Sequence, residues 1–333
     1  MNWRPNEVKY GRNFIQSAIE DQESFLVTTT EVPWNIVKKR VQNEPKKKVF
    51  VKSMERAKVE NLTKNLPDID TVIGIGGGLA IDMGKFVAWK KDTRLVTIPT
   101  VISADAMVTP AIAIRDDWNV RYIGYKTADK VFVDFDIIQE APEAYNRGGA
   151  EDILSSYTAL YDWKLASDRG YETYHENIAK KGEECLEKLE KNATEIKKVS
   201  EKGIKTLIDL YMKELDLCKA FGNSRPEEGS EHFFAYNLEY LTKRPYRHGP
   251  LVGLGIYLMA KLQNERQEKI VDLMDKIDLN YHPMEIDVAR SEVRATLSTL
   301  EWYVEKERLP YTIINEKGIN KEKIRELLEV LEF

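Results

Sequence analysis

The run TVIGIGGGLAIDMGK, residues 71–85, joins an apolar segment, three glycines and the beginning of a helical pattern. Thr71–Ile75 is rich in β-branched residues, as expected of a parallel strand that is buried on both faces. Gly76, Gly77 and Gly78 permit a sharp turn and leave no Cβ between the backbone and a ligand. Helical spacing begins at Leu79. We therefore predict a strand, a glycine turn and a helix N-terminus, which is a site where a phosphate group can bind.

The spacing of these glycines differs from two common phosphate-binding motifs. Leu79 stands where G-x-G-x-x-G requires its third glycine, and Lys85 is followed by Phe86 where a P-loop has Ser or Thr. A tight turn without a ligand therefore stays open as an alternative to the predicted phosphate site.

Strand and helix patterns alternate on both sides of this run. Strands are predicted at 25–30, 48–52, 94–99 and 130–135, helices at 32–42 and 56–65, and a β-hairpin at 111–124. Strands that alternate with helices favour a Rossmann-like parallel sheet, which binds ligands at the carboxyl ends of its strands.

The second half of the chain shows only helical periodicity. Helices are predicted at 153–165, 176–199, 202–220, 250–263, 265–277, 285–304 and 321–331. We expect an N-terminal nucleotide-binding α/β domain, residues 1–145, and a C-terminal all-helical metal-binding and substrate domain, residues 146–333. The active site is expected in the cleft between them.

The composition narrows the class of protein. The chain has 333 residues and a formal net charge of −5, which gives no sign of a nucleic-acid-binding surface. No apolar run is long enough to span a membrane, and the N-terminus lacks the apolar core of a signal peptide. Cys185 and Cys218 are expected to be free thiols. These features predict a cytoplasmic protein.

Three residues form a candidate metal site. Asp152 stands near the start of an apolar helical run, and His232 and His248 lie in unusual polar segments. One Asp and two His suit a divalent metal and leave coordination positions open for a substrate. From spacing alone Asp152 could instead be a helix-capping acid, and each histidine a residue without a ligand role. The absence of a G-x-S-x-G sequence argues against a serine hydrolase.

Five segments, taken in order, resemble one superfamily. They are Pro5 with Tyr10–Gly11, the GGG-x-x-x-D-x-x-K run from Gly76 to Lys85, the P-T-x-x-S-x-D run from Pro99 to Asp105, the G-x-x-D run from Gly149 to Asp152, and His232 with His248–Gly249. The superfamily unites glycerol dehydrogenases, iron-containing alcohol dehydrogenases, glycerol-1-phosphate dehydrogenases and dehydroquinate synthases. Gly229–His232 looks most similar to the glycerol-1-phosphate dehydrogenase branch. Pro250 departs from that branch, in which His-Gly-Glu is usual.

The resemblance implies an NAD- or NADP-dependent dehydrogenase that acts on a polyol phosphate, with sn-glycerol 1-phosphate and dihydroxyacetone phosphate preferred, as in phospholipid biosynthesis. It also implies a homo-oligomer. The implied cofactor-binding residues are Gly76, Gly77, Gly78, Asp82, Thr100, Ser103 and Thr109. One divalent metal, with zinc preferred over iron, would sit on Asp152, His232 and His248 and act as a Lewis acid. Two other readings stay open: a dehydroquinate synthase-like cyclase that uses NAD and metal, and a non-catalytic nucleotide-binding paralogue.

Five further residues are weighed for roles at the site. Asp105 would orient a substrate hydroxyl, with a turn residue as the alternative. Arg247 is the nearest candidate for a substrate phosphate, with a solvated surface charge as the alternative. Lys85 is expected to be an exposed helix cation. The choice between NAD and NADP falls on Glu55 and Arg56, which follow the second strand.

Overall fold

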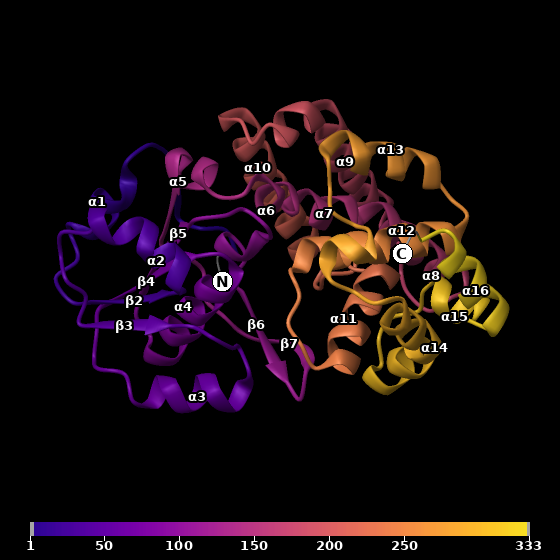
Figure 1. Ribbon diagram of the computed structural model, residues 1–333, viewed down its shortest axis with the longest axis horizontal. Coiled ribbons are helices and arrows are strands. Elements are labelled where there is room, and N and C mark those ends of the chain that lie inside the picture. Colours follow the sequence, from indigo (N-terminus) through magenta and orange to yellow (C-terminus); the bar gives the residue numbers. More distant parts are fainter. Residues whose placement is uncertain (1–2, 332–333) are drawn as a thin grey trace. The chain divides into compact units, whose positions relative to one another are not determined.

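The structure is a computed structural model that describes residues 3–331, and it divides into two compact units. The first contains the chain up to Asn146 together with Val199–Met212, and the second contains Arg147–Lys198 and the chain from Lys213 onward. Each unit is coloured by sequence position in Figure 1. The units are described separately below.

The first unit is built on a six-stranded parallel sheet in the order β1-β8-β5-β4-β2-β3. Its strands are β1 Glu7–Gly11, β2 Phe25–Thr29, β3 Lys47–Phe50, β4 Thr71–Gly76, β5 Arg94–Pro99 and β8 Lys130–Asp134. The predicted α/β fold with a parallel sheet is confirmed. Strand β4, which leads into the three glycines, pairs with β5 on one side and β2 on the other.

Helices cover both faces of this sheet. The helices are α1 Phe14–Ile19, α2 Glu31–Val37, α3 Arg56–Lys64, α4 Gly78–Lys91, α5 Phe135–Glu140 and α6 Glu143–Arg147. Ile73 and Ile75 of β4 pack in one core cluster with Ile15 and Val37. On the other face α4 lies close to the sheet, because a Cβ on Gly84 would stand only 2.9 Å from Thr28 Oγ1.

The predicted β-hairpin is also confirmed. It consists of β6 Ala111–Asp116 and β7 Asn119–Tyr125, which pair antiparallel. Asp117 and Trp118 form its turn, with φ of 47° and 64°. Two successive positive φ values match the handedness of a tight hairpin turn, although neither residue is glycine.

The second unit is helical throughout its described residues, as predicted. Its helices are α7 Gly149–Leu154, α8 Ser156–Asp168, α9 Glu176–Lys197, the end of α10 Glu201–Phe221, α11 Ser230–Thr242, α12 His248–Gln263, α13 Gln267–Ile277, α14 Arg290–Glu307, α15 Ile313–Lys317 and α16 Lys321–Glu329. The single helix predicted at 153–165 was wrong, since α7 and α8 are separated at Ser155. Ser155 keeps helical φ and ψ of −55° and −28°, and its hydroxyl, which has one proton to donate, lies within hydrogen-bond reach of the carbonyls of Asp152 and Glu227.

The helix predicted to begin at Glu285 begins instead at Arg290. Pro283–Ile286 forms a separate 3₁₀ turn, and Asp287 follows it with a φ of 57°. A residue with left-handed φ cannot continue an α-helix. The spacing of apolar residues runs on through this position, so it did not indicate the break.

Helix α10 belongs to both units. Its first half joins the sheet unit, where Tyr211 donates from its hydroxyl to the carbonyl of Ile102 at 2.9 Å. Gln139 also donates to the carbonyl of Val199. The chain thus returns to the first unit after residue 198, well beyond the predicted domain boundary at 145/146.

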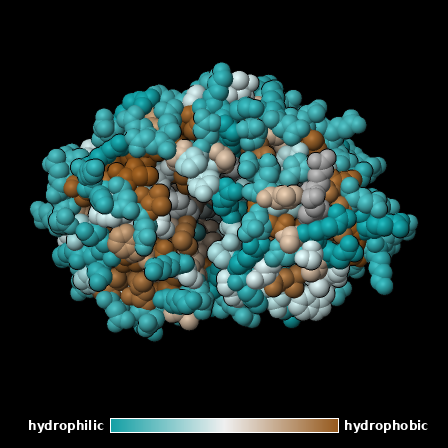
Figure 2. Space-filling model, viewed as in Figure 1, coloured by the Kyte–Doolittle hydropathy of each residue, from teal (hydrophilic) through white to brown (hydrophobic). Residues whose placement is uncertain are grey.

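The face drawn in Figure 2 is mostly hydrophilic and carries several apolar patches. Within residues 3–331, no helix has the length and apolar character that a membrane span requires. Cys185 and Cys218 are both free and buried, as expected from the sequence.

Candidate functional site

The second unit brings Asp152, His232 and His248 together from three different helices. Asp152 lies in α7, His232 in α11 and His248 is the first residue of α12. One ligand atom from each side chain lies within 4.8 Å of the other two. His248 Nε2 is 3.0 Å from Asp152 Oδ1, and the centres of the two imidazole rings are 5.4 Å apart.

Glycines of α12 make this convergence sterically possible. A Cβ on Gly255 would stand 2.4 Å from the carbonyl oxygen of Glu231 in α11. A Cβ on Gly249 would stand 2.1 Å from the carbonyl oxygen of Gly148, beside α7. Since Cβ atoms are not tolerated at these distances, α12 needs glycine where it touches the two helices that carry the other predicted ligands.

The orientation of His232 is fixed by the residue before it. Nδ1 of the imidazole lies 2.9 Å from Glu231 Oε1, which also accepts from the Gly229 amide at 2.6 Å. Thr158 Oγ1 donates to the other carboxylate oxygen at 2.7 Å. A carboxylate on one ring nitrogen leaves the other nitrogen as the ligand atom, as in many metal sites.

The local charges are dominated by carboxylates. Burial lowers the pKa of His232, but the hydrogen bond to Glu231 and the charges of Glu228, Glu231 and Asp152 outweigh it and raise the pKa to about 9. Burial raises the pKa of Glu151 well above its ordinary value, and Asp152 raises it further. Such an acidic, buried environment favours a positive charge between Asp152, His232 and His248.

The three side chains fit a divalent metal on two observations. Asp152 Oδ1 is buried and accepts no hydrogen bond, although His248 Nε2 is close to it. Two imidazole nitrogens and one carboxylate oxygen are also a donor set that zinc and iron accept. The geometry supports the predicted site, while the ligand role of each residue stays a prediction.

Sequence reasoning missed the buried charges that surround these residues. Asp162 of α8 is buried and accepts from the backbone amides of Ser230 and Ile313, which begin α11 and α15. Burial raises its pKa to about 6, against the lowering effect of Arg225. Glu231 and Asp162 each stand in a helical run that is otherwise mostly apolar. This pattern is the feature of the sequence that could have predicted that they are buried.

In the first unit, the glycine turn begins a long, buried helix. Gly76 has a φ of 147°, which strongly favours glycine, and Gly77 caps α4 with an extended backbone. The amide of Thr100 donates to the carbonyl of Gly76 at 3.1 Å. A Cβ on Gly77 would stand 3.1 Å from Val101 Cγ2, so the turn and the segment after β5 lie against each other.

The remaining predicted cofactor residues lie in this segment or on α4. Thr100 is buried, Ser103 and Thr109 are partly exposed, and Asp105 begins a 3₁₀ turn. Each belongs to the same unit as the glycine turn. Arg247, the candidate for substrate phosphate, belongs to the other unit, where it is exposed directly before His248.

The expectation for Lys85 was wrong. Lys85 is buried, with about 1% of the whole residue exposed, and it is not a solvated helix cation. Lys85 Nζ lies 2.6 Å from Asp82 Oδ1 and donates to the carbonyls of Ala111 at 2.6 Å and Thr109 at 3.3 Å. Helical spacing placed Lys85 correctly on α4 but could not show that the β6 segment covers that face.

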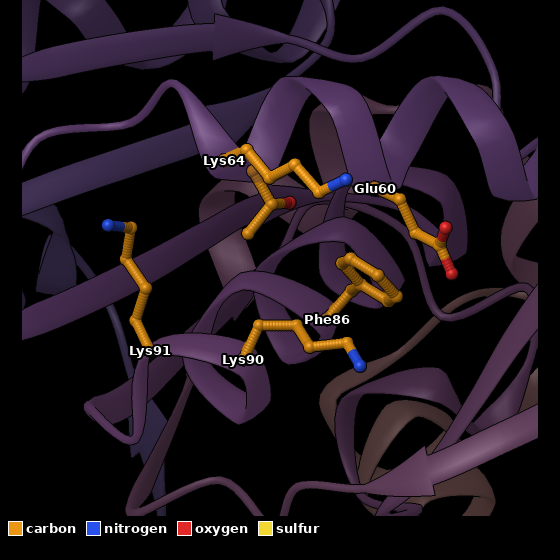
Figure 3. Close-up of a pocket in the computed structure, with 6 residues that line it drawn as sticks. Glu60, Lys64, Phe86, Lys90 and Lys91 are labelled. Atoms are coloured by element: carbon orange, nitrogen blue, oxygen red, sulfur yellow. The ribbon is translucent and has the colours of Figure 1, made fainter.

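The first unit also has a pocket of about 370 Å³ far along α4 from the glycine turn. Figure 3 shows the six lining residues Glu60, Thr63, Lys64, Phe86, Lys90 and Lys91. Its lysines stand in the last turns of α3 and α4, where the helix dipole favours cations without any ligand. Lys91 also extends to the opposite side from Lys90 in Figure 3. The lysines around this pocket are therefore explained by their places at the helix ends.

The parallel sheet with its glycine turn and the helical unit with its Asp-His-His cluster agree with the class of metal-containing NAD(P)-linked dehydrogenases, and this class is shown by the relatives of the chain. The profile of the iron-containing alcohol dehydrogenase family matches residues 4–142. Glycerol-1-phosphate dehydrogenase (NAD(P)+) of Aeropyrum pernix is 32% identical over 255 residues, which is 76% of this chain and 71% of the relative. The enzyme of the same name from Thermococcus sibiricus is 27% identical and covers 96% of this chain and 94% of its own.

The chain belongs to the glycerol-1-phosphate dehydrogenase branch of the iron-containing alcohol dehydrogenase superfamily. Its fold agrees with this membership. A probable glycerol dehydrogenase from Sinorhizobium meliloti superposes with a TM-score of 0.74 over 98% of this chain and 96% of that one, at 17% identity. The resemblance stated from the motifs is confirmed.

Proposed function

We propose that this chain is a metal-dependent dehydrogenase that interconverts sn-glycerol 1-phosphate and dihydroxyacetone phosphate with NAD(H) or NADP(H). The observation that carries the proposal is the convergence of Asp152, His232 and His248 in a member of this branch. The relatives' names supply glycerol 1-phosphate and the cofactor class, and dihydroxyacetone phosphate is the ketone that oxidation of its secondary alcohol gives.

In the proposed mechanism, Asp152 Oδ1, His232 Nε2 and a nitrogen of His248 hold one divalent ion, for which we favour zinc. The ion supplies a Lewis acid that polarises the substrate carbonyl or stabilises the alkoxide. Glu231 keeps the His232 ring in the tautomer and orientation that present Nε2. Arg247, next to His248 in the chain, offers a guanidinium for the substrate phosphate.

The cofactor is proposed to lay its pyrophosphate at Gly76–Gly78 and the first turn of α4. The first amides of a helix have no acceptors within the helix, and together with the helix dipole they attract a phosphate group. Thr100 and Ser103 are proposed to bind the nicotinamide end. Bound there, the nicotinamide would supply the hydride donor or acceptor for the substrate carbon.

The choice of cofactor rests on the two residues that follow β3. Arg56 is paired with Glu60 and Asp116 at 3.1 and 3.0 Å, so its charge is already engaged. Glu55 pairs with Lys58 at 2.6 Å. Since both candidates are already paired with neighbours through exposed side chains, the proposal keeps NAD(H) and NADP(H), which the test below compares.

The test is the reduction of dihydroxyacetone phosphate with NADH and with NADPH, with and without added zinc, while metal content is measured in the wild type and in His248→Ala. We expect metal-dependent oxidation of the cofactor that is lost with the metal in the variant. Bound metal without turnover would turn the search to other polyols or to cyclase substrates. A wild type that binds cofactor but no zinc would contradict the mechanism and favour the non-catalytic paralogue.

The expected homo-oligomeric state and cytoplasmic location remain part of this proposal. Light scattering on the purified chain tests the first, and fractionation of the source cells tests the second. A monomer at all concentrations would contradict the oligomer without affecting the chemistry proposed above.

A further inference from the structure

The buried pair Asp82–Lys85 sits on the helix that carries the glycine turn, but it faces the protein interior. Both residues lie in the first half of α4, three positions apart and therefore on one face of the helix. The Lys85 side chain is 2% exposed and that of Asp82 is 13% exposed. A buried charge is retained only when it is paired and hydrogen-bonded.

The Lys85 ammonium has three partners within the protein, of which two are hydrogen-bond acceptors and one is an ion-pair partner. They are the Asp82 carboxylate at 2.6 Å, the Ala111 carbonyl at 2.6 Å and the Thr109 carbonyl at 3.3 Å. An ammonium group that is buried among two carbonyls and a carboxylate has its charge compensated inside the protein. Lys85 therefore cannot bind a cofactor phosphate without first breaking one of these buried interactions.

Asp82 is attached to the same stretch of chain. It accepts a hydrogen bond from the backbone amide of Ala113 in β6, and the charge of Arg115 adds to the attraction. Both members of the pair thus tie α4 to residues 109–113. The hairpin that starts there has only two strands, and such a hairpin needs outside support to be stable.

Residues 109–113, which the pair holds, form the end of the segment that begins at Thr100. This segment contains Thr100, Ser103, Asp105 and Thr109, the predicted cofactor and substrate residues. Its beginning is tied to the glycine turn through Thr100 and Gly76. Ile102 is held at both backbone groups, by Asn146 Oδ1 on its amide and by the Tyr211 hydroxyl on its carbonyl. Lys85 provides the corresponding attachment at the far end, next to Thr109.

We propose that Asp82 and Lys85 are positioning residues, which hold residues 100–111 against α4 so that Thr100, Ser103 and Thr109 meet the cofactor, and that neither contacts the cofactor itself. This inference rests on the proposed cofactor site at Gly76–Gly78. It replaces the expectation from the motif that Asp82 binds the cofactor.

The first experiment uses the wild type and requires no turnover. Acetic anhydride is applied at low excess with and without NADH, and modified lysines are identified by mass spectrometry. We expect Lys85 to stay unmodified in both samples, while Lys90, exposed on the same helix, reacts in both. Modification of Lys85 in the free protein with protection by NADH would overturn the proposal, because it is the behaviour of a phosphate ligand.

The second experiment compares the double variant Asp82→Asn/Lys85→Met with Lys90→Met. The double variant removes both charges together and leaves no buried charge unpaired. We expect faster hydrogen exchange of residues 100–113 in the double variant alone. NADH should bind about tenfold more weakly, whereas ADP-ribose, which lacks nicotinamide, should change by less than about twofold.

The ratio of these two affinities separates positioning from a general loss of folded protein, which lowers the bound fraction of both ligands equally. Equal weakening of NADH and ADP-ribose, whether from a direct pyrophosphate contact or from a general loss of folded protein, would overturn the inference. Unchanged exchange and unchanged NADH binding would also overturn it. None of these measurements depends on glycerol 1-phosphate turnover, so a failure of the proposed function would be recognised separately.

Discussion

The glycine turn and the Asp-His-His cluster are built in opposite ways. The turn lies in one continuous run, in which β4, the glycines and α4 follow one another directly. The cluster is assembled from α7, α11 and α12, which are distant in sequence and meet only because α12 has glycines at its contacts. A site of the first kind depends on local backbone geometry, and a site of the second kind depends on helix packing.

This contrast predicts that the two sites can be damaged independently. Because each lies wholly within its own unit, a change in one should leave binding at the other intact. The predictions below are ordered by the size of the expected effect, and the two largest measure both sites so that coupling between them would be visible.

The largest effect is expected from Asp152→Ala. Removing the carboxylate takes away one of three proposed ligands, and activity should fall by about 10³-fold or more because the Lewis acid is lost. Metal content is measured by mass spectrometry and NADH affinity by fluorescence titration. Asp168→Ala, which removes an exposed acid from the next helix, is the control. Full metal content in Asp152→Ala would contradict the ligand assignment.

A smaller effect is expected from Gly77→Val, which acts on the other site. The backbone at Gly77 is extended, so a β-branched residue is tolerated there, but its side chain would press on Val101 and fill the approach to the turn. We expect NADH to bind about 10- to 100-fold more weakly, with unchanged metal content. Unchanged NADH affinity would show that the cofactor does not approach this turn.

The same contrast explains what the sequence could and could not predict. The strand, the turn and α4 were predicted correctly because period, β-branching and glycine act over a few residues. The burial of Lys85 could not be predicted, because its partners at Thr109 and Ala111 reach it only through the fold. The return of residues 199–212 to the first unit likewise has no local signature.

The metal cluster needed information beyond spacing. The spacing of Asp152 and the two histidines matches no short metal-binding motif. They were selected because they belong to an ordered set of segments that resembles the family. The supporting carboxylate of Glu231 was overlooked because an acid beside a histidine is common on helix surfaces. Glu231 is buried because α11 packs closely against α12. This burial places its carboxylate where it can orient the His232 ring.

That packing can be tested with Gly255→Ala. The added methyl group would stand 2.4 Å from the Glu231 carbonyl, so α11 and α12 must separate. We expect the free energy of unfolding to fall by about 2 kcal/mol, as for other overpacked cores, together with weaker metal binding. Denaturant unfolding provides the measurement.

Gly182→Ala is the matched control for this change. Gly182 is also buried in a helix of the same unit, but its Cβ would meet Leu160 Cδ1 at 3.0 Å, the end of a flexible side chain. A glycine-to-alanine change in a helix interior is otherwise favourable, so we expect equal or greater stability. Equal stability losses in both variants would show that the α11–α12 contact has no special requirement for glycine.

The smallest effect is expected from Glu231→Gln. Glutamine keeps the shape and can still accept from the Gly229 amide and His232 Nδ1, so the fold and the ring orientation should persist. The neutral amide makes the imidazole a weaker ligand, and we expect about tenfold lower zinc affinity, the lower end of the range for residues that support a metal-binding histidine. Competition with a zinc chelator provides the measurement. Glu239→Gln, buried farther along α11, is the control and should leave affinity unchanged. Equal affinities in the wild type and Glu231→Gln would show that Glu231 orients the ring through its shape alone and that its charge has no part in metal binding.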